Sequence, residues 1–431
     1  MKKTGSFTER EFAMHKPAPK KTRPGLLTGS IVTLSLIFLV IAALLTINNG
    51  VLATMTSFMS EAVADSQTET SQSLDVSSSA SEQSEIEEQP LPQDIIFAKP
   101  NQMKGVYLTA GKDYLLKESD SGETVKAQID AAFSKLAEWG FNTVLVPVST
   151  GDRLLYISST GLDSLIIKNS DGTEFDAPAY IYKCAKERGF FTYGILDMMV
   201  NKVGSNDPST NEGARTIQYM VREAVTRYSF DGWLLDNPGY AAGKCGSFDN
   251  YMMAMPGGGF DNFMRDNITA AVIDVVKAIK NNNINQYVGL LADAVWAHKS
   301  SNELGSNTNG IYESLTDGFA DTRAWIEQGL FDFVMVKNGQ STAHAAASFN
   351  SIFNWWAELC TDAGVTMYIQ HNSNKVCGSE QGWKSPDQLA QQVLACKKSN
   401  AWSGSVFTSF NALVRDNTGS TSALIRAFGD T

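Results

Sequence analysis

Residues 230–236 read Phe-Asp-Gly-Trp-Leu-Leu-Asp, a short apolar run that ends in an aspartate. An uninterrupted run of about four to six such residues is typical of a strand in a parallel sheet that is covered on both faces. Seven similar runs occur between residue 103 and the C-terminus. The predicted strands are Gly105–Leu108, Thr143–Val148, Phe191–Leu196, Gly232–Leu235, Tyr287–Leu291, Phe333–Val336, Thr366–Ile369 and Gly404–Thr408.

Longer stretches with helical periodicity separate these runs. In residues 125–139, for example, apolar residues recur at spacings of three and four, and Gly140 follows as a helix stop. Eight strand–helix units without a strand-only region favour a (β/α)8 TIM barrel over a doubly wound sheet. Residues 109–113, after the first predicted strand, also lack the glycine fingerprint of a dinucleotide-binding fold. We therefore predict a single TIM-barrel domain over residues 103–431.

The composition excludes several classes of function. The 431 residues carry a formal net charge of −11 at pH 7, which argues against nucleic acid as a partner. The four histidines are scattered along the chain, so a multi-histidine metal site is not expected. The five cysteines form no Cys-x-x-Cys pair, and their odd number indicates neither a zinc site nor a complete disulfide framework. We expect no metal and no organic cofactor.

The N-terminal part predicts a membrane anchor. Residues 1–25 carry seven basic and two acidic side chains, whereas residues 26–47 carry no charge. A helix of 22 residues rises about 33 Å, enough to cross the ~30 Å hydrocarbon core of a bilayer. Because positive charge stays on the cytoplasmic side, we expect a single-pass protein of the cell membrane with its C-terminal domain extracytoplasmic. A cleaved signal peptide is the alternative, but its apolar core is shorter, about 7–15 residues.

Residues 48–102 connect this predicted helix to the predicted barrel. Ser, Gln, Glu, Thr and Pro dominate the central part, and nine acidic residues stand against one basic residue between positions 48 and 100. Such a segment cannot bury enough apolar surface to offset the entropy lost on ordering. We therefore predict a disordered linker.

Three aspartates end predicted strands. Asp197 follows the third strand, Asp236 the fourth and Asp293 the fifth. In a TIM barrel the reacting groups lie at the C-terminal ends of the strands, and adjacent strands are about 4.8 Å apart. The carboxyl groups are therefore expected about 5–10 Å from one another, the range found in enzymes that hydrolyse glycosidic bonds with two carboxyl groups. A strand-end aspartate can instead cap the next helix, so a structural role stays open for each of them.

Side chains suited to binding a sugar lie near the same predicted strand ends. Aromatic rings can stack on pyranose faces, and charged or amide groups can hydrogen-bond hydroxyl or acetamido groups. The candidates are Tyr107, Arg153, Tyr156, Asn237, Trp296, Lys337, Asn338, Gln370 and His371. For the aromatic residues among them, packing in the core is the alternative role.

Six short motifs are distributed over residues 104–410. They are Lys104–Thr109, Phe141–Val144, Gly151–Tyr156, Ala185–Gly189, Tyr228–Asp236 and Gly404–Phe410. Together they resemble the glycosyl-hydrolase-like family ten of bacterial envelopes, a resemblance that implies a TIM barrel acting on peptidoglycan glycan strands. This chain has Lys186, Asn237 and Lys337 where the family usually has a histidine, a second acid and part of a Pro-Gln-x-Tyr motif.

These features predict a membrane-anchored, extracytoplasmic glycoside hydrolase that acts on a cell-wall or surface polysaccharide, with peptidoglycan glycan strands favoured. Asp236 is the expected nucleophile or base, and Asp293 or Asp197 the expected proton donor. The departures from the family motifs keep a second prediction open, a catalytically inactive glycan-binding or scaffold barrel at the cell envelope. The two predictions differ in whether a second acid shares an open cleft with Asp236.

Overall fold

The computed structural model describes the C-terminal three quarters of the chain. The described residues are 91–429 without 116, 118, 151–152, 199–205, 242, 245–247, 255–256 and 417. The predicted cytoplasmic segment 1–25, the predicted transmembrane helix 26–47 and most of the predicted linker lie outside these residues. Among the described helices, none has the length and apolar character needed to cross a membrane.

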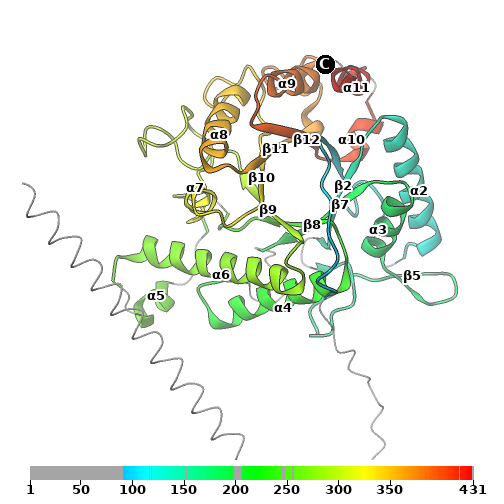
Figure 1. Cartoon of the computed structure of the whole chain (residues 1–431), viewed down its shortest axis with the longest axis horizontal. Helices are drawn as coiled ribbons and strands as arrows, with labels where there is room; N and C mark the ends of the chain where they lie inside the picture. The colour runs from blue at the N-terminus through cyan, green and yellow to red at the C-terminus, as the bar shows by residue number, and fades with distance from the viewer. Residues whose placement is uncertain are drawn as a thin grey trace, which may run out of the picture. The chain divides into compact units, whose positions relative to one another are not determined.

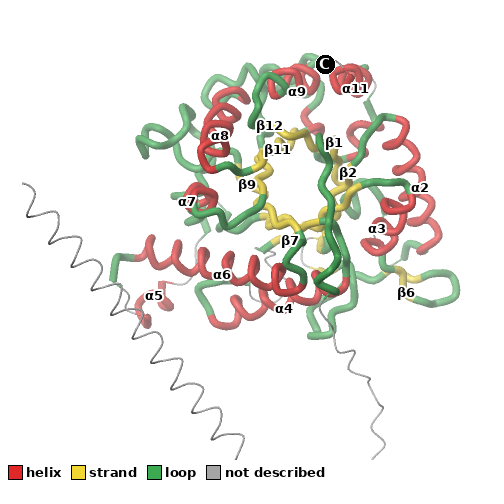
Figure 2. Tube along the Cα trace, in the orientation of Figure 1, coloured by secondary structure: helices red, strands yellow, loops and turns green. Residues whose placement is uncertain are grey.

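Eight parallel strands close into a barrel, the ring of yellow strands in Figure 2. In order around the barrel they are β1 (Met103–Tyr107), β2 (Thr143–Pro147), β7 (Phe191–Asp197), β8 (Gly232–Asp236), β9 (Tyr287–Asp293), β10 (Phe333–Lys337), β11 (Thr366–His371) and β12 (Trp402–Phe407), which pairs with β1. Each strand overlaps a predicted one. The predicted (β/α)8 TIM barrel is therefore confirmed.

Helices form a layer outside the strands (Figure 1). They are α2 (Gly122–Glu138), α3 (Ala177–Glu187), α4 (Asn211–Arg227), α6 (Phe260–Asn282), α7 (Thr322–Glu327), α8 (Phe349–Ala363), α9 (Gln388–Cys396), α10 (Phe410–Val414) and α11 (Ser420–Gly429). Polar caps begin several of them; the side chain of Ser121, for example, accepts a hydrogen bond from the backbone of Thr124. Gly140 follows α2 with a φ of +73°, as predicted for a helix stop.

Short elements decorate the loops. They are the hairpins β3 (Ser149–Thr150) with β4 (Arg153–Leu154) and β5 (Ile167–Lys168) with β6 (Glu174–Phe175), the helix α5 (Phe248–Ala254) and the 3-10 turn η1 (Ser373–Lys375). The hairpins lie between β2 and α3, and η1 follows β11. These insertions extend the loops at the C-terminal ends of the strands.

Side chains alternate along each strand between the barrel interior and the helix layer. On β7, Ile195 belongs to the cluster of buried residues inside the barrel, whereas Leu196 packs against the helices. On β8, Leu234 faces inward and Leu235 outward in the same way. This alternation has a period of two residues. The residue that ends a strand therefore points to the mouth only if it has inward parity, that is, if it lies an even number of residues from one that faces the barrel interior.

Residues 91–97, which belong to the predicted linker, pack against the folded part. The backbone N–H of Leu91 donates to Asn282 Oδ1 at 3.3 Å, and Asn283 Nδ2 donates to the carbonyl of Pro92 at 2.7 Å. These two asparagines are consecutive residues at the end of α6. The folded part therefore begins before the boundary predicted at residue 103.

His371 lies in the core rather than in the mouth, so the predicted substrate-binding role is corrected. It has outward parity on β11 and is fully buried, with its ring between the rings of Phe349 and Phe407. Its two ring nitrogens lie 2.8 Å from Gln392 Oε1 and from Ser405 Oγ. Burial lowers the pKa of the imidazole to about 4, and the hydrogen bond with Gln392 opposes this shift only in part.

The buried histidine predicts a specific loss of stability in acid. In the unfolded chain His371 binds a proton with its ordinary pKa near 6.5, whereas in the folded chain its pKa is about 4. The free energy of unfolding should therefore fall by about 3 kcal/mol between these pH values. Urea denaturation of wild type and His371→Gln at each pH checks this. The difference between the two should follow the titration of one group, and identical pH slopes would contradict it.

A close approach between strands predicts a second stability effect. Gly289 on β9 lies against the ring of Phe333 on β10, and an added methyl group would overlap with that ring. Gly289→Ala should lower the free energy of unfolding by about 1–3 kcal/mol because the packed interior cannot expand freely. The control is Gly257→Ala, where an added Cβ meets nothing within 4 Å. Equal urea midpoints for the two variants would argue against tight packing at Gly289.

Candidate active site

The alternation of side chains brings charged and polar groups together at the C-terminal mouth of the barrel. They are Asp197 on β7, Asp236 on β8, Asp293 on β9, Lys337 on β10 and Gln370 on β11. Asp197 is the direct partner of Asp236 in the register of β7 and β8, and Asp293 is the partner of Lys337 in the register of β9 and β10. The three predicted catalytic aspartates therefore end adjacent strands at one mouth.

Lys337 lies between two of these aspartates. Its Nζ forms an ion pair with Asp236 Oδ1 and lies 3.4 Å from Asp293 Oδ1. It also donates a hydrogen bond to Asn237 Oδ1 at 3.0 Å. From the sequence, Lys337 is predicted only as a sugar-binding group. The structure shows that it is also the cation that offsets the two carboxylates.

The neighbouring acids fix the charge of Lys337. Burial alone would lower the pKa of the ammonium, but the attraction of Asp236 and Asp293 outweighs it and raises the pKa above its ordinary value of 10.5. Lys337 is therefore charged throughout the range in which carboxyl groups titrate. At these pH values the cation holds two negative groups close together that would otherwise repel each other.

Asn237 turns back into the mouth although it follows Asp236 by one residue. Its φ of +46° is in the left-handed region, which asparagine tolerates better than most residues. Its Nδ2 donates to Asp197 Oδ1 at 3.2 Å, and its backbone N–H donates to Asp236 Oδ1 at 2.8 Å. This strained residue therefore links the two carboxyl groups, and such strain is frequent at functional sites.

Tyr107 and Gln370 also lie at the mouth, at the ends of β1 and β11. The hydroxyl of Tyr107 on β1 donates to Gln370 Oε1 at 3.2 Å. Burial, and then the negative charge of Asp236, raise the pKa of Tyr107 well above its ordinary value. The phenol is therefore a neutral hydrogen-bond donor next to the acids.

A cleft of about 310 Å³ opens beside Asp197 and Asp236. Other residues that line it are Tyr107, Lys112, Asn374, Thr408 and Ser409. The sequence did not indicate Lys112, Asn374, Thr408 and Ser409 as site residues. The strand-end rule could have found Thr408, because it ends a predicted strand. The other three lie in loops, and nothing in their spacing along the sequence indicates that the loops meet.

Other predicted sugar-binding residues lie away from the cleft. Asn338 has outward parity on β10, is fully buried and donates to the carbonyl of Phe349 at 2.9 Å. Tyr156 is buried and its hydroxyl donates to the carbonyl of Met220 at 3.2 Å. Both are packing residues in this structure, so their predicted binding roles are corrected.

Trp296 and Arg153 also lie outside the ring of strand-end residues. Trp296 is 5% exposed, donates from Nε1 to Asp321 Oδ1 at 2.8 Å and stacks on Trp355 of α8. It follows β9 in a loop and packs against the helix layer, which corrects its predicted contact with a sugar. Arg153 is half-buried in β4 of the loop after β2.

In the part of the chain that the structure describes, no three His, Cys, Asp or Glu side chains are grouped so that they could hold a metal ion. At the mouth, the cation between Asp236 and Asp293 is instead the ammonium of Lys337. The chemistry that these described side chains offer is proton transfer and nucleophilic attack by carboxyl groups.

Known proteins resemble this chain over part of its length. Glycosyl hydrolase DigH of Escherichia coli (strain K12) is 29% identical over 167 residues, which are 38% of this chain and 38% of DigH. Glycosyl hydrolase YngK of Bacillus subtilis (strain 168) is 25% identical over 160 residues, 37% of this chain and 31% of YngK. This chain therefore matches less than two fifths of the length of either relative.

Among solved structures, a β-glucosidase mutant derived from a hyperthermophilic tetramer has a TM-score of 0.49 and 12% identity, covering 77% of this chain and 95% of that chain. The match to a family model is more specific. The matched residues, 199–385, include Asp236, Asp293 and Lys337. Over them the chain matches the family described as Glycosyl hydrolase-like 10, which confirms the family resemblance predicted from the sequence.

Proposed function

We propose that this chain is a membrane-anchored, extracytoplasmic glycoside hydrolase that cleaves a cell-wall or surface polysaccharide, with peptidoglycan glycan strands as the favoured substrate. The observation that carries the proposal is the cleft shared by Asp197 and Asp236 at the C-terminal mouth of the barrel. The match to the glycosyl hydrolase-like family supports the hydrolase class. The anchor and the location rest on the charge pattern of residues 1–47.

Asp236 is the proposed nucleophile. The Lys337 ammonium and the backbone N–H of Asn237 both contact its Oδ1, so a cation and a hydrogen-bond donor face this oxygen. A nucleophilic carboxylate has to be charged when the substrate arrives. Asp236 also lines the cleft, so a sugar bound there can reach it.

Asp197 is the proposed proton donor. It lines the same cleft, whereas Asp293 contacts Lys337, which separates it from Asp236. Because Asp197 and Asp236 are register partners on adjacent strands, we expect their carboxyl groups about 5 Å apart, the spacing of retaining enzymes.

The proposed reaction has two steps. Asp197 gives its proton to the glycosidic oxygen while the Asp236 carboxylate attacks the anomeric carbon, and the bond between that carbon and the leaving sugar breaks. Asp197 then takes a proton from water, whose oxygen attacks the same carbon and releases the Asp236 carboxylate. Asp197 ends the cycle protonated, and one water has been consumed.

One observation favours the rival function, glycan binding without turnover. The Lys337 ammonium pairs with Asp236 itself, and an ion-paired carboxylate is a weaker nucleophile than a free one. Under this rival the ring of polar groups at the mouth binds sugar hydroxyl groups and no bond is cleaved. Release of reducing ends distinguishes the two functions.

The first test of this proposal removes the nucleophile. Asp236→Asn should hydrolyse the substrate at least about 100-fold more slowly than wild type, because a neutral amide cannot attack the anomeric carbon. The measurement is the appearance of reducing ends from purified peptidoglycan glycan strands. Asp332→Asn is the matched control, since Asp332 pairs with Lys280 where β10 begins and should leave the rate unchanged. Equal release by wild type and Asp236→Asn would exclude Asp236, and no release by wild type would favour the rival.

The second test concerns the cation between the acids. In Lys337→Met two carboxylates lose their shared counter-charge, so ionising both becomes harder and the acid side of the pH–rate profile should move up by about one pH unit or more. Because the pKa of Lys337 is raised, the lysine itself does not titrate in this range. Lys337→Arg keeps the charge and should keep the wild-type profile. A Met variant with an unshifted acid side would show that Lys337 does not control these acids.

A further inference from the structure

A second pocket of about 520 Å³ lies beside the catalytic cleft. Its walls are the loops that follow β1, β11 and β12, so it opens on the same C-terminal face of the barrel. Lys112, Asn374 and Ser409 line both the pocket and the cleft. The two spaces are therefore neighbours that share a wall.

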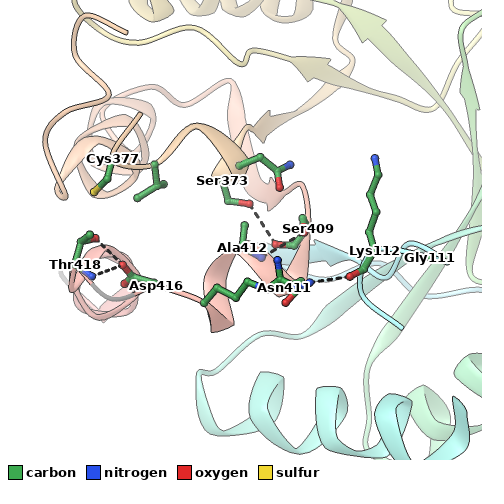
Figure 3. Close-up of a pocket in the computed structure, with 12 residues that line it drawn as sticks. Gly111, Lys112, Ser373, Cys377, Ser409, Asn411, Ala412, Asp416 and Thr418 are labelled. Carbon is green, nitrogen blue, oxygen red and sulfur yellow. Dashed lines mark hydrogen bonds between the residues drawn. The ribbon is translucent and has the colours of Figure 1, made fainter. Parts of the chain in front are cut away.

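Hydrogen bonds between the loop after the first barrel strand, β1, and the loop after the last, β12, hold this shared wall in place. Asp113 accepts from the hydroxyl of Ser409 at 3.0 Å and from the backbone N–H of Asn411 at 2.8 Å. Asn411 Nδ2 in turn donates to the carbonyl of Lys112 at 2.9 Å (Figure 3). Because the loops after β1 and β12 are joined in this way, the wall is preorganised rather than loose.

Strained backbone also occurs in the lining of the second pocket. Ser409 has a φ of +72° and Cys377 a φ of +58°, and both residues line the second pocket. Left-handed conformations of residues other than glycine cost free energy and persist where the surrounding structure imposes them. The surrounding loops therefore hold part of the lining of the second pocket in a defined shape.

The charges of the second pocket favour an anion. Lys112 and Arg415 are exposed cations on its lining. The acid next to Lys112 is Asp113, whose carboxylate already accepts hydrogen bonds from Ser409 and Asn411. In Figure 3 the side chain of Lys112 extends away from the backbone that Asn411 holds. Asp416 is the acid on the lining, and its oxygens already accept hydrogen bonds from the backbone of Thr418 at 2.9 Å and of Thr421 at 2.7 Å.

We propose that the second pocket is a subsite for a carboxylate-bearing sugar residue of the same polysaccharide chain whose glycosidic bond lies at Asp236. Lys112, on the wall that the two spaces share, and Arg415, on the lining of the second pocket, supply the positive charge for charge-assisted hydrogen bonds with the carboxylate. This inference rests on the proposed function and adds to it a preference for an anionic polysaccharide.

The test measures binding rather than turnover. The full-length protein with Asp236→Asn, purified in mild detergent, is titrated by calorimetry with peptide-free peptidoglycan glycan strands and with the same strands after conversion of their carboxyl groups to amides. Adding Lys112→Gln or Arg415→Gln should raise the Kd for the untreated strands about tenfold, since each removes one charge-assisted bond. For the amidated strands, the two variants should bind as the parent does.

Two matched variants control for the change in net charge. Lys277→Gln on α6 and Arg222→Gln on α4 remove exposed cations on the outer helix layer and should leave both Kd values unchanged. Equal affinities for untreated and amidated strands, equal effects of the controls, or no binding would overturn the subsite. The proposed function fails separately: charge-dependent binding without release of reducing ends by the wild type would keep the subsite and exclude hydrolysis.

Discussion

The site depends on the strict two-residue alternation of side chains along the barrel strands. One residue decides whether a strand-end group reaches the mouth or the helix layer. On β11 this places Gln370 at the mouth beside Tyr107 and buries the next residue, His371, between two aromatic rings. On β10 it places Lys337 at the mouth and buries Asn338. The core packing that fixes the register therefore also fixes which groups can take part in chemistry.

Electrostatics then determine how these groups can be held together. Three aspartates at the ends of adjacent strands repel one another unless a cation offsets them. Lys337 supplies that cation from the neighbouring strand, and Asn237 links Asp197 with Asp236 through its strained backbone and its amide. The acids and the lysine form one coupled unit. The side chains of one strand end therefore depend on those of the neighbouring strand ends for their position.

The sequence predicted the barrel well because short apolar runs that alternate with amphipathic helices can be buried in few other arrangements. It also predicted that Asp197, Asp236 and Asp293 end neighbouring strands, because the position of a residue at the end of a strand can be read locally. It was less successful where parity or loop shape decides. His371 and Asn338 lie one residue from a mouth position, and the loop residues Lys112 and Asn374 meet only after the barrel closes. Nor could the sequence show that Lys337 lies between two acids, since this depends on the register of β9 and β10.

The proposed hydrolase requires that Asp197 and Asp236 flank a glycosidic bond in one cleft. The most direct measurement is a crystal structure of the Asp236→Asn protein with a bound glycan oligosaccharide. We expect a glycosidic oxygen within hydrogen-bonding distance of the Asp197 carboxyl group and the anomeric carbon of the same bond facing residue 236. A sugar bound with no glycosidic bond between these two side chains would contradict it.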